Sequence, residues 1–117
     1  MYIQGFVIPV PEGNRDKYRE TADFMADLFK DYGCTEIVEA WEDDVKDGTH
    51  TDFRKAVNAQ PGEKIVFSWA IWPDRETLKA AEEKMMQDDR MDMSEQPPFD
   101  GKRLIFGGFT PLFTMGR

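Results

Sequence analysis

Residues 64–72 read K64-I-V-F-S-W-A-I-W72, and this stretch decides the fold. Successive side chains of a β-strand point to opposite faces of its sheet. One face carries Ile65, Phe67, Trp69 and Ile71, and the other carries Val66, Ser68, Ala70 and Trp72. A strand that is apolar on both faces is typical of the centre of a covered sheet. Pro73 ends the stretch, because proline cannot donate a hydrogen bond to the ladder.

Three more strands and two long helices are predicted outward from this stretch. The strands are expected at Tyr2–Val10, Cys34–Trp41 and Lys102–Phe113. The helices are expected at roughly 15–32 and 75–87, from apolar residues spaced by three and four. The order βαββαβ favours an α+β, ferredoxin-like antiparallel sheet with two helices on one face. We expect a single domain over residues 1–117, with the first and third strands as the central pair.

Local signals predict where these elements begin and end. Pro9 and Pro11 are expected to end the first strand, and Asn14 or Asp16 to cap the first helix. Gly33 is expected to end that helix, and Asp74 to cap the second. Residues 43–63 are polar and irregular and fit a short helix or an extended arm, of which we favour the arm. Gly107-Gly108 indicates a bulge or a close approach by another backbone or a ligand.

Two helices cannot cover both faces of a sheet whose central strands are apolar on both sides. The uncovered face would expose a large hydrophobic area, which in soluble proteins marks an interaction surface. We therefore expect a second copy of the chain to cover it, which gives a homodimer.

The composition excludes several classes of partner. The net charge is −8 and the pI is about 4.6, so the surface repels nucleic-acid phosphates and anionic lipid. The longest basic cluster is the pair Lys102-Arg103. Neither a signal peptide nor a membrane span is recognisable, so a cytoplasmic location is the expectation. A single cysteine, Cys34, excludes a disulfide within the chain and a cysteine zinc cluster.

Three stretches resemble a known family. They are G5-F-V-I-P-V-P11, F67-S-W69 and P98-F-D-G-K-R-L-I-F-G-G-F109. Together they resemble the YbaA-like family of small bacterial proteins of unknown function, along nearly the whole chain. The resemblance implies the dimeric α+β barrel superfamily, whose members include cofactor-independent monooxygenases, haem-degrading enzymes and stress-response proteins. It carries no activity that could be transferred residue by residue.

Glu39 is the first candidate catalytic residue. It lies in the middle of a predicted strand, between Ile37 and Trp41 on one face. If that face points into a cavity, loss of water would raise the pKa of the carboxyl and suit it to acid–base chemistry. The alternative, which we favour on general grounds, is a solvated carboxylate at a sheet edge, or one paired with a cation such as Arg103.

Arg103 is the second candidate catalytic residue. Its planar guanidinium could hold a carboxylate or a phosphate of a ligand. The alternative is a structural ion pair with Asp100 or Glu63, and we favour it because structural ion pairs are common.

Aromatic side chains could line a cavity for a flat organic ligand. The candidates for ligand binding are Phe67, Trp69 and Trp41, and simple core packing is the alternative. From strand parity we predict that Glu39 shares a sheet face with Trp69 and Phe67. Arg103 is the weakest member of this group, because its strand lies on the far side of a ferredoxin-like sheet.

The sequence predicts no cofactor and no metal site. His50 is the sole histidine, and the aspartates around it match neither an EF-hand nor a zinc motif. A solvated loop histidine is therefore the expectation. The run from Lys102 to Phe109 echoes an RNA-binding motif, but its residue order is wrong and it falls on the last strand.

These observations favour a homodimer that binds a small, largely apolar organic molecule. By analogy with the superfamily alone, it would be a cofactor-independent, monooxygenase-like enzyme. The alternative is a non-catalytic dimeric binding or stress-response module. A deep cavity with a desolvated Glu39 or Arg103 would favour the enzyme, and a sheet face filled by its own side chains would favour the module.

Overall fold

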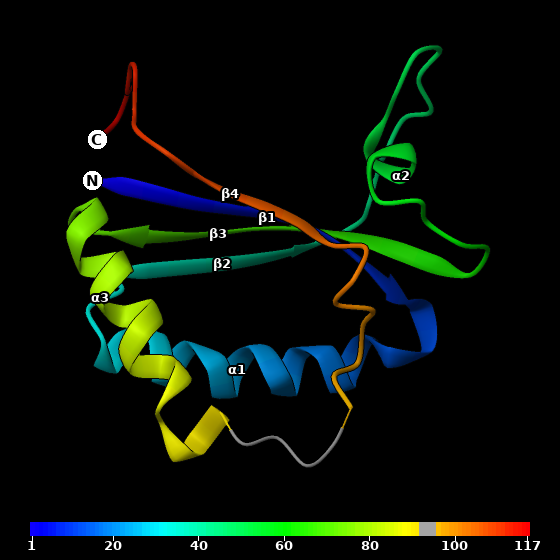
Figure 1. The fold of residues 1–117 in the computed structure, drawn as a ribbon. Helices are drawn as coiled ribbons and strands as arrows, with labels where there is room; N and C mark the ends of the chain where they lie inside the picture. Colours follow the sequence, from blue (N-terminus) through cyan, green and yellow to red (C-terminus); the bar gives the residue numbers. More distant parts are fainter. Residues whose placement is uncertain (92–95) are drawn as a thin grey trace.

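Four strands form one antiparallel sheet in the computed structural model, which describes residues 1–91 and 96–117 (Figure 1). The strands are β1 (Tyr2–Pro11), β2 (Glu36–Trp41), β3 (Glu63–Trp72) and β4 (Ile105–Phe109). Their order across the sheet is β2-β3-β1-β4, so the predicted central pair is confirmed. The predicted α+β, ferredoxin-like fold is confirmed as well.

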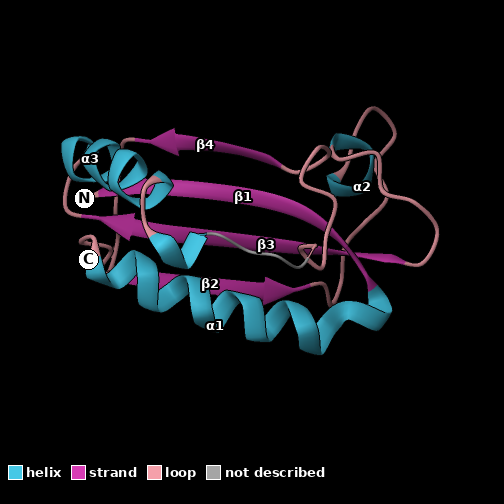
Figure 2. Cartoon of the chain, turned by 60° about the horizontal axis from the view of Figure 1, so that its bottom comes forward, coloured by secondary structure: helices cyan, strands magenta, loops and turns pink. Residues whose placement is uncertain are grey.

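Two long helices lie against one face of this sheet. They are α1 (Arg15–Asp31) and α3 (Arg75–Met86), and Figures 1 and 2 show both on the same side. Two short 3-10 turns, at Glu12–Asn14 and Asp89–Met91, precede α1 and follow α3. Among the helices described here, none combines the length and the apolar character needed to cross a bilayer.

The register of the central strands decides which side chains face the helices. Trp72 pairs with Tyr2, and Ser68 pairs with both Phe6 on β1 and Glu39 on β2. The even-numbered residues of β1 and β3 and the odd-numbered residues of β2 therefore face the helices. One core cluster surrounds Trp72, and a second surrounds Ile8, Val10, Tyr18 and Val66.

Neither α1 nor α3 covers the opposite face of the sheet (Figure 1). Its side chains include Ile3, Val7, Val38, Phe67, Trp69, Ile105 and Phe109. The exposed fractions of Phe67 and Phe109 are 47% and 59%. Two projections rise beside this face: the C-terminal residues 110–117 and the loop that carries α2 (Phe53–Ala56) (Figure 1).

Three segment predictions need correction. β1 continues through Pro9 to Pro11, because β4 pairs only with Ile3–Val7 and the prolines lie where that side of β1 has no ladder partner. β4 begins at Ile105, three residues after the predicted start. The third correction is that Phe53–Ala56 forms a short helix and no extended arm, because the Asp52 carboxylate accepts a hydrogen bond from the Lys55 N–H at 2.7 Å.

The helix ends follow the predicted signals more closely. The Asp74 carboxylate caps α3 by accepting from the Thr77 N–H at 2.7 Å, as predicted. At the start of α1, neither predicted cap acts as one: Asn14 stands at the N-cap, but its side-chain amide donates to the Pro98 carbonyl at 3.1 Å. At Gly107-Gly108, where a bulge or a close approach by another backbone or a ligand is predicted, the close neighbour is instead a side chain: a Cβ on Gly108 would collide with the Tyr2 ring.

Gly33 ends α1 in a conformation that only glycine adopts readily. Its φ is +109°, its N–H donates to the Lys30 carbonyl, and the next N–H, of Cys34, donates to the Phe29 carbonyl. This pair of hydrogen bonds is a Schellman motif. A Cβ at this position would also lie 2.8 Å from Cγ2 of Thr77 on α3.

We expect Gly33→Ala to lower the free energy of unfolding by about 1–3 kcal/mol, from backbone strain and the Thr77 contact. Urea denaturation followed by circular dichroism measures this. Gly101→Ala is the matched control: nothing lies within 4 Å of its added Cβ, and we expect an effect within about 0.5 kcal/mol. Equal effects of the two substitutions would contradict the strain argument.

Candidate functional site

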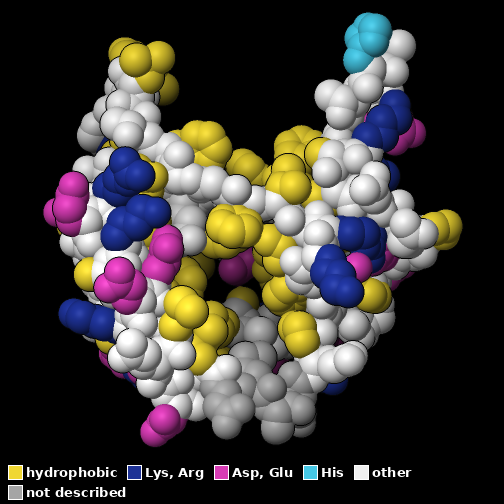
Figure 3. Space-filling view, in the orientation of Figure 1, with side chains coloured by type: hydrophobic (Ala, Val, Ile, Leu, Met, Phe, Trp, Pro, Cys, Tyr) yellow, Lys and Arg dark blue, Asp and Glu magenta, His cyan; other side chains and the backbone are white. Residues whose placement is uncertain are grey.

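A cavity of about 380 Å³ lies between the helix-facing side of the sheet and α1. This volume is within the range of small-molecule sites. Its walls are mostly apolar and include Phe6, Ile8, Met25, Phe29, Ile37, Phe99 and Leu104. Figure 3 shows the hollow rimmed by hydrophobic side chains, with an acidic side chain inside it.

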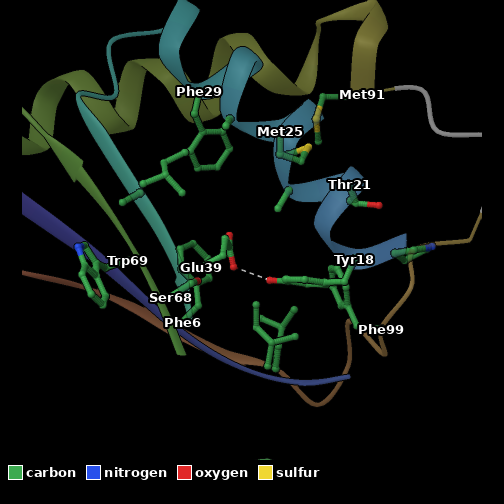
Figure 4. A pocket seen from close by; sticks show the side chains of 17 residues that line it. Phe6, Tyr18, Thr21, Met25, Phe29, Glu39, Ser68, Trp69, Met91 and Phe99 are labelled. Carbon is green, nitrogen blue, oxygen red and sulfur yellow. Dashed lines mark hydrogen bonds between the residues drawn. The ribbon is translucent and has the colours of Figure 1, made fainter. Parts of the chain in front are cut away.

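Within residues 1–91 and 96–117, Glu39 is the one residue with a carboxyl group that borders this cavity. It comes from β2 and points toward α1, where the Tyr18 hydroxyl donates a hydrogen bond of 2.7 Å to its Oε1 (Figure 4). Tyr18 itself is buried, and its ring meets the Phe99 ring edge-on, with 5.8 Å between centroids. Glu39 is exposed on the edge strand β2 and borders the cavity, so a bound molecule could reach this carboxyl.

The surroundings of the pair shift both of its ionisations. The sheet and the helix remove much of the water around Glu39, and this desolvation raises the pKa of its carboxyl. Hydrogen bonds from Tyr18 and from the Ser68 hydroxyl, which faces Glu39 across the β2–β3 ladder, oppose the rise. Desolvation and the neighbouring Glu39 also raise the pKa of Tyr18, so its hydroxyl stays protonated and remains a donor.

The predicted grouping of Glu39 with Trp69 and Phe67 is wrong. Trp69 pairs with Val38 in the observed register, so its indole lies on the face opposite Glu39 and donates to the Glu36 carboxylate at 3.2 Å. Trp69 still borders the cavity from its place in β3. Phe67 lies on the same open face as the indole, with its ring 6.0 Å from that of Phe53. A register one residue away from the one assumed moves every side chain to the other face, and the sequence does not fix that register.

Trp41 does lie on the same face as Glu39, two residues along β2. It borders a smaller cavity beside the first one, together with Glu39 and Tyr18. Of the three aromatic residues predicted to bind a ligand, Trp41 is thus the one whose side chain the register places next to Glu39.

Arg103 lies away from the cavity, in ion pairs. Its guanidinium donates to both carboxylate oxygens of Glu63, at 2.7 and 2.6 Å, and to Asp100 at 2.9 Å. These partners are the ones that the structural alternative named. The interaction with Arg103 holds the pKa of the Glu63 carboxyl below its usual range. The geometry therefore gives Arg103 a role in anchoring the chain before β4 to the start of β3.

Tyr18 is the residue of this site that sequence reasoning missed. It was assigned to the apolar stripe of the first helix, where its ring does pack. The available signal was its hydroxyl, because a phenol on a buried stripe needs a hydrogen-bond partner. The position of Ser68 opposite Glu39 depends on the β2–β3 register, which the sequence does not fix.

Comparisons with known proteins place the chain among bacterial relatives. The family described as "Protein of unknown function (DUF1428)" matches residues 1–101. The uncharacterized protein YbaA of Escherichia coli strain K12 is 52% identical over 112 residues, which are 95% of this chain and 96% of that protein. The YbaA protein of Shigella flexneri matches with the same identity and coverage.

A solved structure shares the fold. It is the crystal structure of a MhuD mutant with two manganese protoporphyrin IX molecules bound per active site. The TM-score is 0.65, and the alignment covers 100% of both chains at 14% sequence identity.

The raised pKa of Glu39 predicts how stability depends on pH. A carboxyl whose folded pKa exceeds its unfolded value of about 4.3 is charged more easily in the unfolded chain, so stability falls as pH rises from the unfolded pKa through the folded one. Glu39→Gln removes this term and keeps an oxygen for Tyr18. We therefore expect the difference in melting temperature, variant minus wild type, to increase as pH rises from about 4 to 8.

Glu36→Gln serves as a control with the opposite sign. Hydrogen bonds from Arg117 and Trp69 lower the pKa of the Glu36 carboxyl. The melting temperature of Glu36→Gln, relative to the wild type, should therefore decrease as pH rises. Differential scanning fluorimetry across this pH series measures both differences. A pH-independent difference for Glu39→Gln would contradict the assigned desolvation.

Proposed function

We propose a function for this chain, which belongs to the DUF1428 family. The protein binds a small, largely apolar organic molecule in the cavity between the sheet and α1, where the Glu39 carboxyl serves as an acid or a base. The resemblance to the YbaA-like family, seen first in its sequence stretches, is confirmed. One observation carries the proposal: among the residues that the structure describes, Glu39 is the carboxyl group that borders a cavity whose other walls are mostly apolar.

The chemistry of the pair suggests what the ligand offers. An apolar body would fill the cavity, and one polar group, such as a carbonyl or a hydroxyl, would meet Glu39. In its protonated form Glu39 can donate a hydrogen bond, and as a carboxylate it can accept a proton from the ligand. The raised pKa brings these two forms closer in energy near neutral pH.

The cavity supports an enzyme more than a passive module. The criterion was a deep cavity that contains a desolvated Glu39 or Arg103, and the desolvation that raises the pKa of Glu39 beside this cavity supports it. An apolar cavity with one carboxyl base is also what a cofactor-independent monooxygenase-like reaction would need from the protein. That reaction class rests on superfamily analogy.

The residues around the cavity do not fit a haem, although the MhuD structure binds manganese protoporphyrin IX. Among the described residues, neither histidine nor cysteine lines the cavity. His50 is exposed in the loop before α2, and the Cys34 thiol donates to the backbone carbonyls of Glu36 and Ile71. The strong haem ligands, imidazole and thiolate, therefore lie elsewhere. The proposed chemistry therefore uses the side chains of the cavity itself.

We also propose that a second copy of the chain covers the open face of the sheet. Helices cover one face of the sheet, and the other face is a contiguous apolar surface. A symmetric dimer typically buries a surface of this kind. Both edge strands, β2 and β4, also have one free side. The same family resemblance supports this assembly.

The projections beside the open face point to the same occupant. Leu112 and Phe113 are 100% and 85% exposed on the C-terminal projection, and Phe53 on α2 is 44% exposed. Because both projections rise on the side away from α1 and α3 (Figure 1), a partner sheet placed between them would cover these side chains together with the sheet face.

A thermal-shift screen tests the ligand proposal. Phenols, quinones and small aromatic ketones are the probes, and one of them at 100 times its Kd should stabilise the fold by about 2.7 kcal/mol, a shift of several degrees. We expect Glu39→Gln to abolish the shift caused by such a probe. Glu36→Gln, on the opposite face, should leave it unchanged. A shift that survives Glu39→Gln would assign Glu39 a structural role only.

Light scattering behind size exclusion tests the assembly. At micromolar concentration the wild type should have twice the chain mass of 13.6 kDa. Phe67→Glu places a charge on the open face and should give a monomer. Met86→Glu, at a side chain of α3 that is 83% exposed, is the matched control and should remain dimeric. A monomeric wild type would refute the proposed assembly.

A further inference from the structure

The smaller cavity beside Glu39, of about 230 Å³, differs in character from the apolar one. It adds two arginines of α1, Arg15 and Arg19, and the indole of Trp41. Three residues border both cavities: Tyr18, Ala22 and Glu39.

The two cavities lie end to end along the groove between α1 and β2. On β2, Ile37 borders the apolar cavity, Glu39 borders both, and Trp41 borders the smaller one. On α1, Met25 borders the apolar cavity and Arg15 the smaller one. The Tyr18–Glu39 hydrogen bond therefore crosses the groove where the cavities meet, and the small side chain of Ala22 leaves room beside it.

The arginines have donors available for a ligand. The Arg15 guanidinium lies 5.9 Å from the centre of the Trp41 ring, which orients it over the cavity. Its ion-pair partner is the neighbouring Asp16, at 3.7 Å, whose side chain is 93% exposed, so this pair is weak. Arg19 forms no ion pair with any residue in the described part of the chain.

The location of these cations is informative because the chain as a whole carries a net charge of −8. An anion is repelled by most of this surface, and here it meets two guanidinium groups one helical turn apart. A guanidinium binds a carboxylate through two parallel hydrogen bonds, which a neutral group cannot match.

We infer that the two cavities form one site for an amphipathic organic acid, with the apolar body between the sheet and α1 and the carboxylate at Arg15 and Arg19. This inference rests on the proposed function, and it adds the chemical class of the ligand. Glu39 and Tyr18 then lie beside the part of the ligand next to its acid group.

Isothermal titration with decanoate and decanol tests the inference, because the two probes share an apolar chain and differ in charge. We expect the wild type to bind decanoate about tenfold more tightly than decanol. The double variant Arg15→Gln/Arg19→Gln should lose this preference and bind decanol as the wild type does. Arg75→Gln/Lys79→Gln, which removes two charges at the same spacing on exposed positions of α3, is the matched control and should keep the preference.

The remaining outcomes separate the inference from the proposed function. Equal binding of both probes by the wild type would overturn the inference and leave the apolar site in place. Failure of both probes at millimolar concentration would count against the apolar site as well. Acetate that tightens decanol binding in the wild type, and does not in the double variant, would support the carboxylate site and show that the acid group can come from a separate molecule.

Discussion

The register between β2 and β3 is the constraint on which the rest of this structure depends. It pairs Glu39 with Ser68 and Val38 with Trp69, and so it places one carboxyl toward α1 and one indole toward the open face. A slip of β2 by one residue would turn Glu39 to the open face, while pairing with β1 would keep Trp69 where it is. It would also remove the hydrogen bond from Tyr18, because that hydroxyl reaches Glu39 only on the helix side of the sheet.

This register explains why the two faces of the sheet differ in character. The helix-facing side is closed by α1, α3 and the chain around Phe99, and the incomplete filling beneath α1 leaves a cavity with a polar group inside. The open side is apolar and flat enough for another sheet, as expected of a partner surface. The proposed ligand and the proposed partner would therefore lie on opposite faces of the same four strands.

The sequence was sufficient for the fold because several independent signals agreed. The doubly apolar pattern of residues 64–72, the helix spacing, Gly33 and Asp74 all predict the same βαββαβ order, and each is a local property. The site was harder to predict because it depends on pairings between distant segments. Glu39 was recognised as a candidate, but its partner Tyr18 is 21 residues away and meets it only through packing of α1. The strand register and the full set of partners of Arg103 likewise depend on contacts that no local pattern specifies.

Glu39 also creates a conflict between the folding stability of the protein and its proposed activity. A carboxyl in an apolar cavity costs folding free energy, and so does unfilled volume beneath α1. Laboratory evolution toward heat resistance alone should therefore replace Glu39 with an apolar residue and fill the space beside Ala22. Positions where such selection and selection for activity favour opposite residues would outline the site from genetics alone, before its ligand is known.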